Sequence, residues 1–521
     1  MIQSERRSRT VTQGQQNHRG RAQFRVDEEQ ESTPIDDRLF GSFVEHLGRG
    51  IYSGIYEPGH PTADEQGFRR DVMDLVKELG VTTIRYPGGN FVSGYRWEDG
   101  VGPRESRPRR LDLAWHSGES NEFGLHEMRD WLDKLGGNEL MEAVNLGTRG
   151  MQEALDLLEY CNVPSGTELS ERRRANGHDR PFNIRMWCLG NEMDGDWQIG
   201  HKSAEEYADL ANRTAVAMRM IDPDLDLVVC GSSSHTMPTF GLWERTVLER
   251  CFDNVNFLSC HAYYAPKDGD MASFLASGVD MDGFITDVAA TIAASRARLG
   301  SDHQVFISFD EWNVWYQDAE ASRSPEGIGN WPVGAPLLED VYSAADAVVV
   351  GDLLITLLRH ADVVHAASLA QLVNVIAPIM TEPGGPAWRQ TIFYPFALTA
   401  RYARGASVLK SLQSGDTYET SRYGQVPMTD SVAVRGADGS LSIFAVNRSL
   451  DRSVDFSIAL PEQDRHRQAT VSTLHEDDPS ARNTLEDQER VVMHARKDFR
   501  MDGDTLDLQL PPVSWTVIHL A

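Results

Sequence analysis

Apolar and polar residues follow two different rhythms along the chain, and the rhythm changes near residue 404. From residue 40 to about residue 378, short apolar runs alternate with longer segments whose apolar positions recur at the helical period. The helical segments include residues 68–80, 151–161, 204–221 and 284–300. The apolar runs predict eight strands, at residues 39–46, 81–89, 140–147, 183–190, 225–232, 255–263, 304–312 and 363–371.

Alternating strands and helices indicate a parallel sheet. Eight such strands between residues 40 and 378 favour a (β/α)₈ barrel over an open doubly wound sheet. No glycine-rich phosphate loop follows the first strand, which removes the commonest reason to expect the open sheet. After residue 404, short alternating strands are separated by Gly, Asp, Asn and Pro. The predicted fold is therefore α/β, a (β/α)₈ TIM barrel followed by an all-β, jelly-roll-like sandwich.

These patterns divide the chain into four parts. Residues 1–20 are polar and predict a flexible arm, and residues 21–37 contain a strand expected to pack on the C-terminal sandwich. The catalytic barrel is predicted over residues 38–395 and the sandwich over residues 396–521. Within the barrel, residues 165–181 are charged and are expected to form a surface linker.

The charge balance restricts the partners. The 521 residues carry 78 acidic and 50 basic side chains, for a formal net charge of −28. Nucleic acids and anionic membranes both need a basic surface, so neither is expected as a partner. The longest apolar stretch, residues 347–367, is interrupted by charged residues and is not expected to span a membrane. The first twenty residues show no apolar segment typical of a secretory signal, which predicts a cytoplasmic location.

The cysteines and histidines do not form a recognisable metal motif. The five cysteines are odd in number and lack C-x-x-C spacing, so we expect neither a disulfide framework nor a zinc site. His235, His261 and His365 lie at separate predicted strand ends and could together bind a metal. Because no local ligand pair such as H-E-x-x-H is present, we expect no metal and no cofactor.

Two glutamates stand at the ends of predicted barrel strands. Glu192 follows the fourth strand within the sequence CLGNE, and Glu311 follows the seventh within DEWNVWY. In a ring of eight strands these two ends face each other across the mouth, where barrel enzymes place their reactive groups. A pair of carboxyl groups flanking a cleft is what glycoside hydrolysis requires, one acting as an acid and the other ionised.

Five ordered motifs carry a family resemblance: residues 41–57, 85–103, 113–124, 188–192 and 310–316. Together they resemble the α-L-arabinofuranosidases of glycoside hydrolase family 51, from about residue 22 to the C-terminus. The resemblance implies a retaining mechanism with Glu192 as acid/base and Glu311 as nucleophile. It also implies that Arg85 hydrogen-bonds the nucleophile and keeps it ionised, that Trp115 forms an aromatic wall beside the sugar, and that five residues contact the furanose: Glu45, Asn90, Asn191, Tyr263 and Gln371.

The predicted function is an exo-acting, retaining α-L-arabinofuranosidase that releases terminal arabinofuranose from arabinan or arabinoxylan oligosaccharides. The two carboxyl groups should then stand roughly 5–5.5 Å apart. One alternative is an endo-β-glucanase on a related barrel, and another is a carbohydrate-binding protein without catalysis. The loop over residues 321–340 carries Trp331 and is a candidate for shaping the leaving-group side. The resemblance also implies a homo-oligomer, a hexamer.

Overall fold

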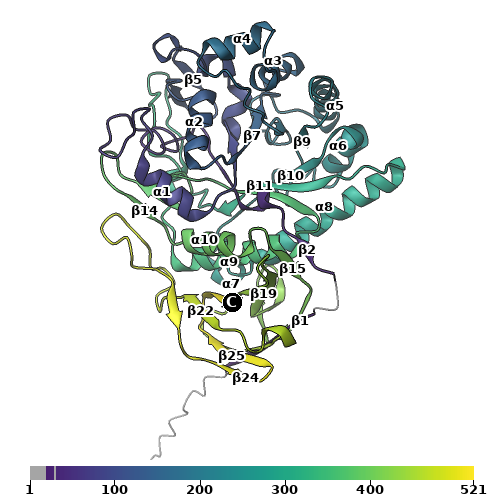
Figure 1. The fold of residues 1–521 in the computed structure, drawn as a ribbon, viewed down its shortest axis with the longest axis vertical. Helices are drawn as coiled ribbons and strands as arrows, with labels where there is room; N and C mark the ends of the chain where they lie inside the picture. The colour runs from purple at the N-terminus through teal and green to yellow at the C-terminus, as the bar shows by residue number, and fades with distance from the viewer. Residues whose placement is uncertain (1–18, 28–30) are drawn as a thin grey trace, which may run out of the picture.

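The computed structural model describes residues 19–27 and 31–521 and contains a closed barrel above a β-rich domain (Figure 1). All eight predicted strands form the barrel, in the spatial order β10-β11-β12-β3-β4-β7-β8-β9 with every neighbour pair parallel. The (β/α)₈ prediction is confirmed. The barrel strands are β3 (Gly41–Phe43), β4 (Thr83–Tyr86), β7 (Glu139–Val144), β8 (Met186–Leu189), β9 (Asp226–Val229), β10 (Phe257–Tyr264), β11 (Phe306–Val314) and β12 (Val364–Leu369).

Most of the helices that surround the barrel pack one apolar face against it. In α1, for example, Val72, Leu75, Val76 and Leu79 are buried, and Gly80 ends the helix in the left-handed conformation with φ 82°. The four predicted helical segments are all helices in the structure. The helices are α1 (Arg70–Leu79), α2 (Leu125–Leu135), α3 (Met151–Asn162), α4 (Glu168–Ala175), α5 (Ala204–Ile221), α6 (Leu242–Cys251), α7 (Met271–Phe274), α8 (Ser277–Leu299), α9 (Ala344–Arg359) and α10 (Phe393–Ala403).

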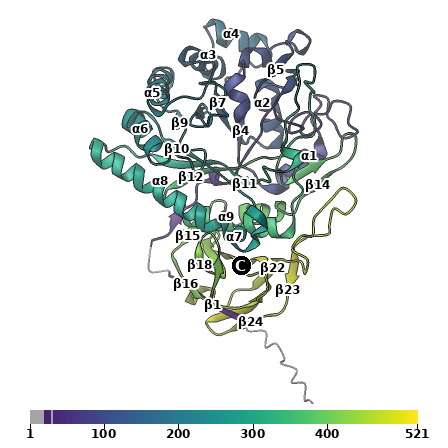
Figure 2. The same ribbon diagram turned by 180° about the vertical axis from the view of Figure 1, so that it is seen from behind.

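The helix α9 lies between the barrel and the β-rich domain, as Figures 1 and 2 show. It packs on β11 on one side and on β19, β20 and β26 on the other, and every residue from Ala344 to Leu358 is buried. Burial on all sides explains why this segment is the longest apolar stretch of the chain. Among the described residues, we find no helix with the length and apolar character needed to cross a membrane.

The β-rich domain consists of two sheets. One has the order β2-β15-β19-β20-β26-β22-β23, and the other the order β16-β1-β21-β25-β24. The strands are β1 (Gly20–Val26), β2 (Thr33–Pro34), β15 (Ser407–Leu409), β16 (Ser411–Gly415), β19 (Thr429–Arg435), β20 (Leu441–Asn447), β21 (Val454–Ala459), β22 (Ala469–Leu474), β23 (His494–Arg496), β24 (Phe499–Asp502), β25 (Thr505–Leu510) and β26 (Ser514–Leu520).

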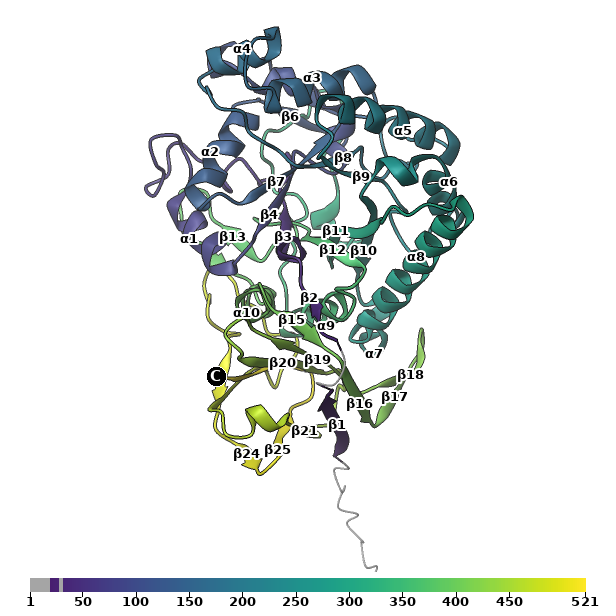
Figure 3. The same ribbon diagram turned by 45° about the vertical axis from the view of Figure 1, so that its right-hand side comes forward.

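The N-terminal strand β1 belongs to the C-terminal domain, as Figure 3 shows. It pairs antiparallel with β16 and parallel with β21, and Ala22, Phe24 and Val26 join the apolar core between the sheets. The predicted polar arm, residues 1–20, lies almost wholly outside the described residues.

A separate two-stranded hairpin, β17 (Thr417–Thr420) with β18 (Gly424–Pro427), reaches back to the helices of the barrel. There the Tyr418 hydroxyl donates to the Ala272 carbonyl at 3.0 Å.

Two segments differ in detail from the expectation. Residues 165–181, expected as a surface linker, contain α4, and Arg173 within it is fully buried. Its guanidinium donates to the carbonyls of Tyr160 and Val163 at 2.8 and 2.7 Å, so this charged side chain closes the end of α3. At the other end of the barrel, α10 spans residue 395 and packs on α1 and α9, so the helical layer continues to Ala403.

Candidate active site

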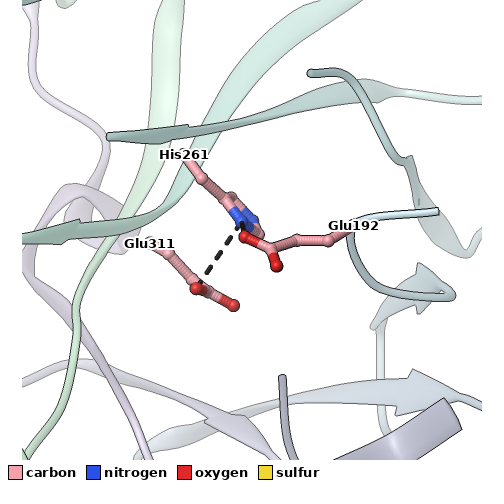
Figure 4. A group of neighbouring side chains, drawn as sticks. All are labelled: Glu192, His261 and Glu311. Atoms are coloured by element: carbon pink, nitrogen blue, oxygen red, sulfur yellow. Dashed lines mark hydrogen bonds and ion pairs between the residues drawn. The ribbon is translucent and has the colours of Figure 1, made fainter. Parts of the chain in front are cut away.

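The ends of the fourth and seventh barrel strands bring two glutamates together at the mouth (Figure 4). Glu311 lies within β11, whereas Glu192 follows β8 after the turn at Gly190. Glu192 adopts a left-handed backbone conformation with φ 44°, which a side chain rarely takes and which is concentrated at functional sites. One ligand atom each of Glu192, His261 and Glu311 lies within 4.8 Å of the others. We call these three residues the glutamate–histidine cluster.

Both oxygens of Glu311 accept hydrogen bonds, one from a buried guanidinium and one from a partly buried phenol. Arg85, on β4, donates from Nη1 to Oε1 at 2.7 Å, and the Tyr263 hydroxyl donates to Oε2 at 2.7 Å. The other end of the Arg85 guanidinium donates to Asn191 Oδ1 at 2.5 Å, and Asn191 Nδ2 lies 3.4 Å from Asn90 Oδ1. Burial raises the pKa of Tyr263 well above its usual range, so this hydroxyl remains a donor. Glu311 is therefore held in one orientation by a cation and a neutral phenol.

The partners of Glu192 are different. Trp197 donates its indole N–H to Oε2 at 2.7 Å, and His261 Nδ1 lies 2.8 Å from Oε1. His261 Nε2 contacts Asp310 Oδ1 at 3.0 Å, and Nδ1 also lies 3.5 Å from Glu311 Oε2. Burial alone would lower the pKa of His261, but Glu311, Asp310 and Glu192 raise it to about 10. The imidazole is thus a cation that links the two glutamates.

A second set of contacts surrounds Glu45, which follows β3. Its Oε1 accepts the Phe91 backbone N–H at 2.9 Å and the Trp115 indole N–H at 3.0 Å, and its Oε2 accepts from Gln371 Nε2 at 3.0 Å. Burial raises the pKa of Glu45 to about 8, with a smaller contribution from the charge of Glu311. Gln371 Oε1 is buried without a hydrogen-bond partner among the described residues, which is unusual for a buried acceptor.

Trp115 reaches Glu45 because a small hairpin carries it over the mouth. The hairpin consists of β5 (Arg110–Asp112) and β6 (Ser117–Glu119), and Asp112 fixes the turn by accepting the Trp115 backbone N–H at 3.0 Å. His116, the next residue, stacks on Trp331 with ring centroids 3.7 Å apart. The 321–340 loop therefore meets the hairpin beside Trp115.

The structure brings all nine predicted site residues into this one region. Two further groups were missed as site residues: Trp197, whose signal is only its position five residues after Glu192, and His261, which the sequence offered as a core or metal-binding histidine. The three histidines do not converge, since His235 lies beside Asp280 and His365 stacks on Phe306. Within the described residues, the single group with metal-ligand spacing is the glutamate–histidine cluster itself. The five cysteines are all buried and free.

A (β/α)₈ barrel with facing carboxyl groups after its fourth and seventh strands defines a class of enzyme, the barrel glycoside hydrolases. Two family models match the chain: the α-L-arabinofuranosidase 1 domain over residues 75–276, and the α-L-arabinofuranosidase C-terminal domain over residues 310–514. The chain belongs to the α-L-arabinofuranosidases of glycoside hydrolase family 51.

Individual relatives cover nearly the whole chain. An exo-α-(1→6)-L-arabinofuranosidase of Bifidobacterium longum is 70% identical over 95% of this chain and 96% of its own. An intracellular exo-α-(1→5)-L-arabinofuranosidase of Streptomyces lividans is 55% identical over 96% of this chain and 75% of its own. A solved family 51 α-L-arabinofuranosidase from Bifidobacterium longum superposes with a TM-score of 0.91 at 48% identity, covering 96% of this chain and 99% of that one.

Proposed function

We propose that this protein is an exo-acting α-L-arabinofuranosidase that hydrolyses its substrate with retention of configuration, with Glu311 as nucleophile and Glu192 as acid/base. The observation that carries the proposal is the approach of the two carboxyl groups, with one oxygen of each within 4.8 Å of the other. Retaining enzymes hold the pair about 5–5.5 Å apart, whereas inverting enzymes need roughly 6.5–9.5 Å to admit a water.

The hydrogen-bond partners support the assignment of roles. Glu311 accepts from Arg85 and Tyr263 at both oxygens, which suits an anion whose oxygen must point at the anomeric carbon. Glu192 shares a hydrogen bond of 2.8 Å with His261 Nδ1, and the cationic imidazole supplies a proton at this bond. An imidazole can relay a proton in either direction, which suits a residue that gives a proton in one step and takes one back in the next.

The reaction then proceeds in two balanced steps. Glu311 forms a bond to the anomeric carbon while the bond to the leaving oxygen breaks, and Glu192 transfers a proton to that oxygen, which releases the alcohol. Glu192 next accepts a proton from water as the water oxygen attacks the anomeric carbon, which releases arabinose and regenerates the Glu311 carboxylate. Glu45, Asn90, Asn191 and Gln371 hold the furanose hydroxyls during both steps.

Azide rescue of two variants tests the roles. With an activated aryl arabinofuranoside, Glu192→Ala should form the covalent intermediate and stall, and azide should restore turnover and give the azide with the substrate's own configuration. Glu311→Ala cannot form the intermediate, so azide should attack directly and give the opposite configuration. NMR of the two products distinguishes these outcomes, and the reverse pattern would exchange the roles of the two residues.

The names of the relatives also bear on the linkage. The relative at 70% identity is named for α-(1→6) linkages and the one at 55% for α-(1→5) linkages. In both linkages the leaving oxygen is a primary alcohol on a flexible CH₂ group. We therefore expect oligosaccharides with arabinofuranose on a primary hydroxyl to be cleaved faster than those with α-(1→2) or α-(1→3) linkages. Competition between the four disaccharides in one reaction, followed by chromatography, measures the preference directly.

Location and assembly are part of the same proposal. Several relatives are named intracellular enzymes, and uptake of short oligosaccharides from arabinan or arabinoxylan would match a cytoplasmic exo-enzyme. A hexamer is expected from the family resemblance, and light scattering on the purified protein tests it. Family membership weighs against the endo-β-glucanase alternative, and the presence of both carboxyl groups weighs against a non-catalytic binding protein.

A further inference from the structure

A cavity of about 830 Å³ lies at the same end of the barrel as the two glutamates, and its lining includes neither of them. The lining comes from the segments that follow β4, β7 and β8, and includes Gly94, Leu113, Arg149 and Ile199. None of the lining residues follows β10, β11 or β12, the strands on the Glu311 side of the barrel. The cavity therefore lies on the Glu192 side of the mouth.

The cavity adjoins the site, because residues in its wall also contact site residues. Phe91 lines it and donates its backbone N–H to Glu45, and Asp112 lines it and accepts the backbone N–H of Trp115. Ile199 comes two residues after Trp197, which is half exposed and hydrogen-bonded to Glu192. A leaving group must sit beside the residue that protonates it, so a chain attached to the leaving oxygen departs from the site on the cavity's side.

The composition of the lining suits a neutral polyhydroxylated ligand. Arg149 forms a bidentate pair with Glu98 at 2.6 and 2.8 Å, and Arg110 pairs with Asp99 at 2.7 and 3.1 Å, so these two cations are already neutralised. Arginine–carboxylate pairs still offer planar donors and acceptors at their edges. An anionic ligand would have to compete with these carboxylates.

Two further features point to a ligand. Asn121 lines the cavity and is fully buried, and its Oδ1 has no hydrogen-bond partner among the described residues. Buried acceptors are almost always satisfied, so an unsatisfied oxygen in the wall of this cavity is unusual. Leu111 and Leu113 are 58% and 64% exposed on the hairpin rim, and apolar side chains of this kind can contact the C–H faces of sugar rings.

We infer that this cavity is a distal subsite that binds the oligosaccharide chain of the leaving group beyond the sugar next to the scissile bond. This inference rests on the proposed function. Its volume falls within the range of about 300–1,000 Å³ for ligand pockets, enough for a short oligosaccharide. The enzyme would then favour longer leaving chains although it removes only one terminal sugar at a time.

Gly94 allows the subsite to be filled. A Cβ added there would meet only Ile199 Cδ1, at 3.7 Å, which is ordinary contact, and Gly94 lines the cavity that a larger side chain would enter. Gly94→Trp is the filling variant and Gly94→Ala the matched control, since both replace the glycine and only one fills space. Leu113→Asp is an independent variant on an exposed position, where a failure to fold is not expected.

The measurement is kcat/KM for arabinofuranosyl oligosaccharides of two, three and four residues, each divided by kcat/KM for an aryl arabinofuranoside on the same variant. This ratio removes general effects on catalysis. In the unmodified enzyme this ratio should rise about fivefold when the substrate is lengthened from two to four sugar residues. A fivefold change corresponds to the energy of one or two hydrogen bonds to uncharged partners. Gly94→Trp and Leu113→Asp should abolish the rise, and Gly94→Ala should keep it.

Three results would overturn the inference. These are a ratio that does not increase with chain length in the unmodified enzyme, an increase kept by both Gly94→Trp and Leu113→Asp, and an increase lost by Gly94→Ala as fully as by Gly94→Trp. Failure of the proposed function looks different, because the unmodified enzyme would then not cleave the aryl arabinofuranoside at all. A chain-length effect absent from an enzyme that cleaves the aryl substrate contradicts the subsite alone.

Discussion

Replacing Glu45 by glutamine should make the protein more stable at alkaline pH and less active. The carboxyl group is fully enclosed, and burial raises its pKa from 4.5 to about 8. Between these two values the folded protein holds a proton that the unfolded chain has released, so stability falls as the pH rises through this window. Glutamine has nearly the same shape and no charge, and therefore removes this pH-dependent loss.

The size of the effect follows from the pKa difference. A difference from 4.5 to about 8 at about 1.4 kcal/mol per pH unit corresponds to at most about 5 kcal/mol of unfolding free energy above pH 8. With an unfolding entropy of about 2.1 cal/mol/K per residue over 521 residues, this is about 4 °C in Tm. The new amide can also be accommodated, because Gln371 can turn its unpartnered Oε1 toward it.

The same change should reduce activity. Below pH 8 the Glu45 carboxyl group is protonated, and losing its neutral hydrogen bond to a furanose hydroxyl should lower kcat/KM by roughly 2- to 12-fold. Scanning calorimetry of both proteins from pH 5 to pH 9 gives the Tm difference, which should grow with pH in favour of the variant. A Tm difference that does not change over this range would refute the shifted pKa. Unchanged kcat/KM would show that Glu45 does not contact the substrate.

Three further outcomes follow from the contacts described above. Activity should survive dialysis against a strong chelator, because His261 in the glutamate–histidine cluster is already a cation; loss restored by one particular ion would identify a metal site there. Trp197→Phe removes the indole donor to Glu192 and should lower kcat/KM about tenfold for alkyl leaving groups, with a much smaller loss for an activated aryl group. Arg448→Met leaves Asp352 and Asp430 buried without their shared cation, so the Tm should fall by the equivalent of about 3–5 kcal/mol. If the Arg448→Met protein were as stable as the unmodified one, the attraction within these buried ion pairs would only balance the cost of removing their charges from water.

The barrel could be predicted from the sequence because its information is local. Each parallel strand is buried on both faces and reads as a short apolar run, and each helix shows its own period. The positions of Glu192 and Glu311 then follow from counting strands, since the C-terminal ends of parallel strands meet at one mouth. The roles of Trp115 and Gln371 came from the family resemblance, because no local pattern distinguishes them from core or capping residues.

Contacts between distant loops could not be read from the sequence. The pairing of β1 with β21 joins residues more than 400 positions apart, and no local pattern near Ala22 distinguishes this partner from other strands of the sandwich. His261 is similar: its bonds to Glu192 and Asp310 depend on how three strand ends converge. The cavity beside Glu192 is formed by three separate loops, and its unsatisfied Asn121 oxygen can be recognised only once those loops are placed.

The balance of charge in the site connects its stability to its chemistry. Four buried carboxyl groups face two buried cations: Glu45, Glu192, Asp310 and Glu311 against Arg85 and His261. Burial is the main cause of the raised pKa of Glu45, and the negative charge of Glu311 raises this pKa further. Hydrolysis of a glycoside passes through an oxocarbenium-like transition state, which is positively charged. An acidic, preorganised pocket is therefore unfavourable when empty and most favourable when that charge develops.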